Sequence, residues 1–175
     1  MPLIRDEGIS AHHWRLAGPE DDLAHAAQVI APYARLDELL DGRAGVPVGL
    51  ALPNDADLAP LSAHVDAIQL ITVAFPAFSD GRGFSLAKRI RALGYEGELW
   101  AAGHLIPDQY AFARSCGFDA VLVDEAVFER QTESDWQGAA RSLSLAYQSG
   151  TAGWQEGPRS ILELRRAARA ALAAE

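Results

Sequence analysis

At 175 residues, with 49% hydrophobic and 22% charged residues, the chain has the length and composition of one globular domain rather than of a disordered or fibrous protein. Its 24 acidic and 15 basic residues give a net charge of −9, and this negative field disfavours nucleic acid and anionic membranes as partners. Cys116 is the single cysteine, which excludes an intramolecular disulfide and a multi-thiolate zinc or iron–sulfur site.

The amino-terminal segment lacks the pattern of a targeting sequence. Residues 1–8 become acidic at Asp6 and Glu7 and contain no apolar run of the signal-peptide kind. No apolar stretch in the chain approaches the roughly 20 residues that a membrane-spanning helix needs, so we expect a cytoplasmic protein. Residues 2–16 predict a short hairpin or an extended arm that turns at Asp6-Glu7-Gly8.

Apolar runs alternate with amphipathic stretches through the middle of the chain, a pattern typical of βα units with parallel strands. The expected strands are mostly continuous apolar runs at residues 28–31, 46–52, 68–74, 98–102 and 120–123. We therefore predict an α/β fold with a mainly parallel sheet of about five strands flanked by helices. The sheet is either open and doubly wound or a partial (βα) barrel, and we favour the open form.

The helices between these strands are recognised by their apolar spacing and their end signals. Apolar residues on one face predict a helix over residues 85–93, which Gly94 ends. A second helix is expected to begin near Pro107 and to end at Gly117. Weaker patterns predict helices at residues 36–40, at 57–64 and from 133 to about 147.

The carboxyl-terminal part of the chain has a different character. We expect residues 1–148 to form one α/β domain, residues 149–157 to form a linker rich in Gly, Ser and Gln, and residues 158–175 to form a helix. That helix would carry a narrow apolar seam at coiled-coil spacing, flanked by arginines. The seam can fold back on its own domain or contact a second copy, and we slightly favour a homodimer contact.

The loop after the third predicted strand is the first candidate site, because ligands of α/β proteins gather at the carboxyl ends of the strands. Arg82, Gly83 and Ser85 could bind a small oxyanion, and Asp80 could orient the guanidinium or accept a proton. The alternative is structural: Asp80 or Ser85 caps the following helix and the glycines make a tight turn. The loop matches neither the phosphate-binding nor the dinucleotide-binding pattern, so we expect no cofactor.

Two further loops follow predicted strands. In the first, His104 could transfer protons, with Asp108 or Gln109 as a positioning group, although a turn histidine is more often solvated or structural. In the second, Asp124 and its neighbour Glu125 could serve acid–base chemistry, but ordinary loop solvation explains them better. The five histidines show no ligand spacing, so we expect no metal site.

The chain contains several separated motifs: Met1-Pro2-Leu3-Ile4, Leu52-Pro53-Asn54-Asp55, Asp80-Gly81-Arg82, Gly94-Tyr95-Glu96-Gly97-Glu98, Asp108-Gln109 and Cys116-Gly117-Phe118-Asp119. Together they resemble the motifs of a bacterial family catalogued as a domain of unknown function, and the similarity covers most of residues 1–148. Genes of that family commonly lie beside those for assimilatory sulfite reductase and the reductase for activated sulfate, and one member is called an oxidoreductase. The resemblance therefore implies, by association, a role in sulfur assimilation.

Three hypotheses follow from these observations. The leading one is an accessory protein of sulfite reduction that binds sulfite reductase, another sulfur-assimilation enzyme or an oxyanion through the Asp80-Gly81-Arg82 loop. The second is a small-molecule enzyme, such as an oxidoreductase, whose site combines this loop with His104, Asp108 and Gln109. The third is a non-catalytic half-barrel that serves as a binding scaffold. An enzyme would need these groups to converge on one pocket.

Overall fold

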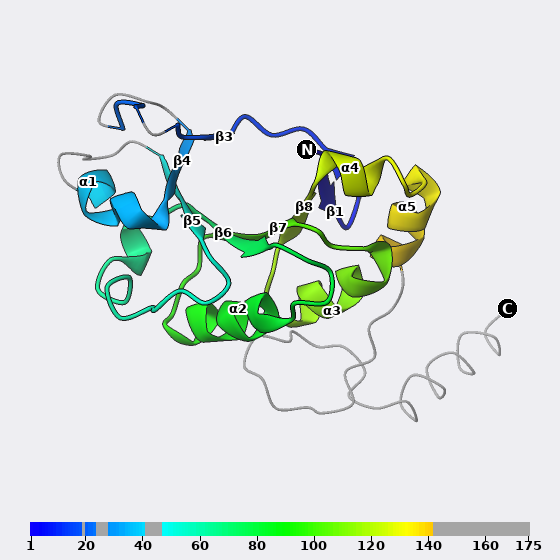
Figure 1. Cartoon of the computed structure of the whole chain (residues 1–175). Helices are drawn as coiled ribbons and strands as arrows, with labels where there is room; N and C mark the ends of the chain where they lie inside the picture. The colour runs from blue at the N-terminus through cyan, green and yellow to red at the C-terminus, as the bar shows by residue number, and fades with distance from the viewer. Residues whose placement is uncertain (19, 24–27, 41–46, 142–175) are drawn as a thin grey trace, which may run out of the picture. The chain divides into compact units, whose positions relative to one another are not determined.

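The computed structural model describes residues 1–18, 20–23, 28–40 and 47–141, which belong to one compact unit (Figure 1). In this part of the chain, no helix is long and apolar enough to cross a membrane. The predicted linker at residues 149–157, the helix at 158–175 and its homodimer contact lie outside the described residues and stay predictions.

The described residues contain one sheet of eight strands, in the order β2-β1-β8-β7-β6-β5-β4-β3. The strands are β1 (Leu3–Arg5), β2 (Gly8–Ser10), β3 (Arg15–Leu16), β4 (Val29–Pro32), β5 (Val48–Leu52), β6 (Leu70–Phe75), β7 (Glu98–Gly103) and β8 (Ala120–Val123). All neighbours from β3 to β8 are parallel, whereas β1 is antiparallel to both β8 and β2. The five predicted strands are therefore confirmed as β4 to β8, and the predicted amino-terminal hairpin is confirmed as β1 and β2.

Two expectations about the sheet were wrong. The sheet has eight strands rather than about five, because the amino-terminal segment adds β1 and β2 at one edge and β3 at the other. The sheet is also a curled half-barrel rather than the open, doubly wound form that we favoured. Its parallel strands follow one another in chain order without a reversal, and right-handed crossovers that always advance in one direction place their helices on one face.

Helices α2 (Arg82–Ala92) and α3 (Tyr110–Ser115) lie along the lower side of the sheet in Figure 1, while the segment that leads to β3 crosses the opposite side. The other helical segments are η1 (Tyr33–Arg35), α1 (Leu36–Leu40), η2 (Val65–Ala67), η3 (Pro107–Gln109), α4 (Glu125–Phe128) and α5 (Glu133–Arg141). These bounds confirm the helix predicted at 36–40, the one beginning at Pro107 and, with an earlier start, the one at 85–93. The helix expected from 133 is described up to Arg141.

The helix predicted at 57–64 was wrong, because this segment consists of turns followed by η2. Polar side chains there bond the local backbone: the Asp57 carboxylate accepts the amide of Ala59 at 3.1 Å. Pro60 has no amide to donate and disfavours a helical conformation at the residue before it. Local side-chain bonds and proline together outweigh the weak apolar spacing.

Side chains alternate across the sheet, which gives the structure two apolar clusters. In β6, Ile71, Val73 and Phe75 pack into the larger cluster, together with the buried faces of α2 and α3. Leu70 points to the other face, where it shares a smaller cluster with Trp100 of β7. The carboxyl ends of the parallel strands, and the loops that follow them, therefore lie together at one edge of the sheet.

Candidate functional site

The loops that follow β5 and β6 meet at the carboxyl edge of the sheet. Asn54 donates its amide to Asp80 at 2.8 Å, and Arg82 binds the same carboxylate through Nη2 at 2.7 Å and Nε at 3.0 Å. A second carboxylate, Asp55, lies 3.3 Å from Nη1 of Arg82. We refer to these four residues, Asn54, Asp55, Asp80 and Arg82, as the Asp80–Arg82 cluster.

Local packing fixes the position of this cluster. Asp80 also accepts the backbone amide of Arg82 at 3.2 Å, which holds the first turn of α2 against the loop. Behind it, Gly83 lies flat on the ring of Phe75, so that a Cβ atom at this position would come within 2.5 Å of the ring. Gly83, which we predicted to take part in anion binding, is therefore needed here because a side chain would collide with Phe75.

Asp80 is held in its ionised form. The Arg82 guanidinium, aided by the Asn54 amide, holds the pKa of the Asp80 carboxyl well below its usual range. In return, Asp80 raises the pKa of Arg82. A carboxylate with a strongly lowered pKa is a poor proton acceptor near neutral pH, so Asp80 is suited to positioning rather than to general base catalysis.

Several donors at this loop already have internal acceptors. The side chain of Arg82 is bound by Asp80 and Asp55, and its backbone amide is bound by Asp80. The amide of Phe84 donates to the carbonyl of Gly81 at 3.1 Å. An anion at this loop would have to displace these contacts, and anion binding by Arg82, Gly83 and Ser85 stays a prediction.

The candidates after β7 occupy separate positions. The backbone amide of His104 donates to the carbonyl of Phe75 at 2.8 Å, and its side chain is exposed. Gln109 accepts the amide of Ile106 at 3.2 Å and donates to the carbonyl of Phe78 at 2.7 Å. Gln109 therefore ties the loop after β6 to the start of the helical segment after β7.

Asp108 and Asp124 each belong to a different local structure. Asp108 lines a cavity of about 620 Å³ between η3 and α5, which also includes Gln131, Ser134 and Asp135. Asp124 caps α4 by accepting the amide of Ala126 at 3.0 Å. The structure describes the side chains of all four candidates, Asp80, His104, Asp108 and Asp124. No hydrogen bond or ion pair joins any two of them.

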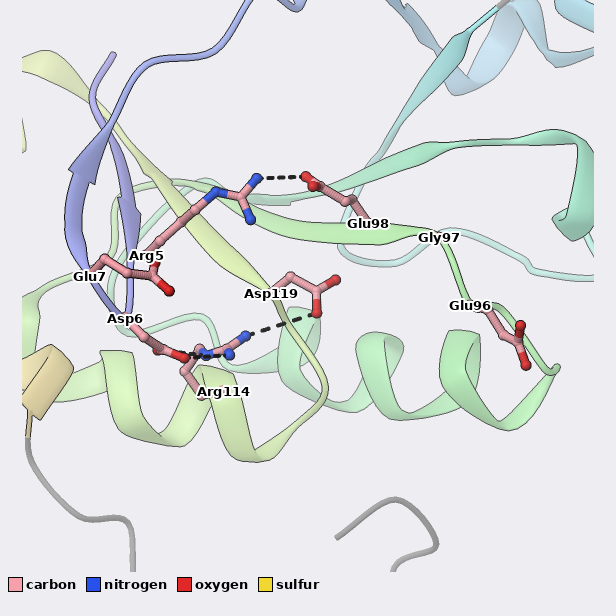
Figure 2. A pocket seen from close by; sticks show the side chains of 8 residues that line it. All are labelled: Arg5, Asp6, Glu7, Glu96, Gly97, Glu98, Arg114 and Asp119. Carbon is pink, nitrogen blue, oxygen red and sulfur yellow. Dashed lines mark hydrogen bonds and ion pairs between the residues drawn. The ribbon is translucent and has the colours of Figure 1, made fainter. Parts of the chain in front are cut away.

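A second cavity, of about 310 Å³, lies at the opposite edge of the sheet, where β7 and β8 begin (Figure 2). It is lined by Arg5, Asp6, Glu7, Glu96, Gly97, Glu98, Arg114 and Asp119. Two ion pairs across it join the hairpin to β7 and to α3: Arg5 with Glu98 at 2.8 Å and Arg114 with Asp6 at 2.7 Å. These contacts connect parts of the chain more than 90 residues apart.

Sequence reasoning missed two features of these sites. It noted Asn54 and Asp55 only as motif residues, although their place directly after β5, the neighbour of β6, signals that they meet Asp80. No sequence signal connects Asp6 to Arg114. The described residues contain no group of three or more His, Cys, Asp or Glu side chains that could hold a metal ion.

Comparison with known proteins is consistent with the motif resemblance. A family model described as "Bacterial protein of unknown function (DUF934)" matches residues 49–156, which include the Asp80–Arg82 cluster and Asp108. No curated protein and no solved structure matches the chain.

Proposed function

The chain belongs to this bacterial family of unknown function, and we propose that it is an accessory protein of sulfite reduction that binds a reductase through the Asp80–Arg82 cluster. The sulfur part of the proposal rests on the gene neighbourhood that the motif resemblance implies. The binding part rests on the geometry of the cluster.

The proposed binding role rests on one observation: the guanidinium of Arg82 is already bound by carboxylates of the same chain. Its side chain is 57% exposed, yet Asp80 and Asp55 hold it in place. A charged group that is both exposed and fixed presents a preorganised pattern of donors and acceptors, which suits recognition of a partner surface. Four residues earlier in the chain, Phe78 is 61% exposed, as is common for an aromatic anchor in an interface.

The enzyme hypothesis has weaker support from the same geometry. Asp80, His104 and Asp108 belong to different local networks, whereas a catalytic site needs its groups within reach of one substrate. The cavity beside Asp108 is the feature that favours a small-molecule site. The non-catalytic half-barrel scaffold is compatible with the accessory role and is an alternative to the enzyme hypothesis.

The test is direct binding of the purified full chain to assimilatory sulfite reductase from the same bacterium, measured by biolayer interferometry. We expect Arg82→Ala to weaken this binding at least tenfold, because it removes the exposed charge and releases Asp80 and Asp55. Arg130→Ala is the matched control, since Arg130 is also exposed and forms no ion pair with the described residues.

Calorimetry with sulfite, sulfate and phosphate tests the oxyanion version of the proposal. Heat that Arg82→Ala abolishes would support anion binding at the loop. The accessory role is rejected if the reductase does not bind the wild-type chain at all. A small molecule that copurifies with the chain, in the absence of reductase binding, would favour the enzyme hypothesis.

A further inference from the structure

We propose that the outer surface shared by α2 and α3 binds an acidic segment of a partner protein, with exposed aromatic rings as anchors. We define this surface, the α2–α3 face, by Phe78, Lys88, Arg89 and Phe112. The inference rests on the proposed function, because it assumes that the chain binds a partner protein and adds what the bound part of that partner is made of.

Two exposed rings provide the apolar part of the face. Phe112 of α3 is 53% exposed and packs edge-on against Phe84 of α2, with ring centroids 4.8 Å apart. Phe78 is brought to the same region because Gln109, next to the start of α3, binds its carbonyl. Exposed phenylalanines on a folded surface, held by a rigid layer of helices, are typical of binding sites.

The charge of α2 sets the face apart from the rest of the molecule. Between Arg82 and Ala92 the helix contains four basic residues and no acidic residue, in a chain with a net charge of −9. Two of these cations are used internally, because Arg82 pairs with Asp80 and Arg91 pairs with Asp119 at 2.6 Å.

The other two cations have no acidic partner among the described residues. No carboxylate of the described residues forms an ion pair with Lys88 or Arg89, and both side chains are exposed. Lys88 Nζ lies 6.0 Å from the centroid of the Phe112 ring, so charge and aromatic surface are adjacent. In Figure 1, α2 and α3 both lie along the lower side of the sheet, and the contact between Phe84 and Phe112 joins the two helices.

These features fit an acidic protein segment better than other anionic partners. A cation beside an exposed ring, with a second exposed cation on the same helix, complements carboxylates that surround an aromatic or aliphatic side chain. Two cations are few for a nucleic acid or an anionic membrane, and the acidic remainder of the chain would repel both.

The test uses two probes of the full chain. The first is an acidic peptide with one Phe and one Trp among Asp and Glu residues, together with its neutral counterpart in which Asn and Gln replace the acids. Chemical-shift changes of the backbone amides map where each peptide binds. The second probe is the sulfite reductase of the binding experiment above.

We expect the acidic peptide, but not the neutral one, to shift amides of α2 and α3. Arg89→Glu and Phe112→Ala should each weaken its binding about fivefold or more, and Arg130→Glu, which changes the net charge equally, should leave it within twofold. Thermal unfolding of each variant checks that the fold is retained.

The outcomes separate this inference from the proposed function. If the peptide binds at the face but the reductase does not bind the chain, the face is supported and the sulfite reduction role is rejected. If the reductase binds and Arg89→Glu and Phe112→Ala do not weaken it, the inference is wrong. Equal losses in Arg89→Glu and Arg130→Glu, shifts elsewhere on the chain, or tighter binding of RNA or anionic vesicles at the face would also overturn it.

Discussion

At the scale of single residues, Gly103 determines how the end of β7 passes into the loop that carries His104. Its φ of +122° lies in the region that favours glycine, and a Cβ atom there would come within 2.4 Å of the carbonyl oxygen of Phe75. The same oxygen accepts the amide of His104 at 2.8 Å. The carboxyl ends of β6 and β7 are therefore locked together beside the candidate site.

Gly103→Ala should lower the free energy of unfolding by about 2–4 kcal/mol, because it adds a backbone clash to the cost of an unfavourable φ. Urea denaturation measures the change. Gly94→Ala is the matched control: Gly94 has a φ of +90°, but no atom lies within 4 Å of its added Cβ. We expect a loss of only about 1 kcal/mol there, and equal losses at both positions would contradict the role of the Phe75 contact.

At the scale of elements, Arg91 connects the end of α2 to the strands that follow. Its guanidinium donates to the carbonyls of Gly117 at 2.9 Å and Tyr95 at 2.8 Å, and it pairs with Asp119 at 2.6 Å. Asp119 in turn accepts the amide of Leu99 at the start of β7. One side chain thus fixes the entries to β7 and β8.

Arg91→Ala should destabilise the protein by about 2–3 kcal/mol, since several part-buried carbonyls lose their donor. Arg91→Lys should recover little of this loss, because an ammonium group cannot reproduce the planar set of donors. Arg89→Ala is the control on the same helix and should stay within about 0.5 kcal/mol of the wild type. Thermal and urea unfolding of the three variants decide the matter, and full rescue by lysine would count against the network.

The elements were largely predictable from the sequence for a physical reason. The strands from β4 to β8 are buried on both faces and read as continuous apolar runs, and α2 and α3 have clear end signals. The helix expected at 57–64 failed because side-chain bonds to the backbone and Pro60 compete with weak periodicity. The Asp80–Arg82 cluster was only partly predictable. Asn54 and Asp55 reach Asp80 because β5 and β6 are neighbours in the sheet, and the sequence does not specify that strand order.

At the scale of the whole molecule, strand order was the information that the sequence lacked. Open and curled sheets share the same alternation of strands and helices, and they differ only in the direction of successive crossovers. The contacts of the amino-terminal hairpin are equally long-range: Asp6 binds Arg114 and the hydroxyl of Tyr110, more than 100 residues away. No local pattern encodes such a pairing.

These hairpin contacts should make stability depend on acid pH. Burial acts to raise the pKa of Asp6, but hydrogen bonds from Arg114 and Tyr110 outweigh it and lower the pKa below its ordinary value. The stabilisation is therefore complete above the ordinary aspartate pKa and is lost as the pH falls through the lowered folded value.

Asp6→Asn should lower stability by about 0.5–1 kcal/mol at pH 7, a modest value because the pair is partly exposed and screened. The loss should shrink as the pH falls below the ordinary aspartate pKa, because the wild-type carboxyl then becomes protonated as well. Urea denaturation from pH 2.5 to 7 measures this. Asp66→Asn, at an exposed carboxylate without an ion pair to the described residues, is the control, and a pH-independent loss at Asp6 would contradict the linkage.

The pairing of β1 with β8 has a consequence for synthesis on the ribosome. Leu3 and Ile4 pair with Leu122 and Val121, and both are fully buried in the finished sheet. At roughly 5–20 residues per second, the ribosome needs on the order of ten seconds to make the partner strand after it has made β1. During that interval β1 lacks the strand with which it pairs in the sheet. A nascent chain stalled before β8 would therefore expose the apolar residues of β1 to chaperones and to other chains.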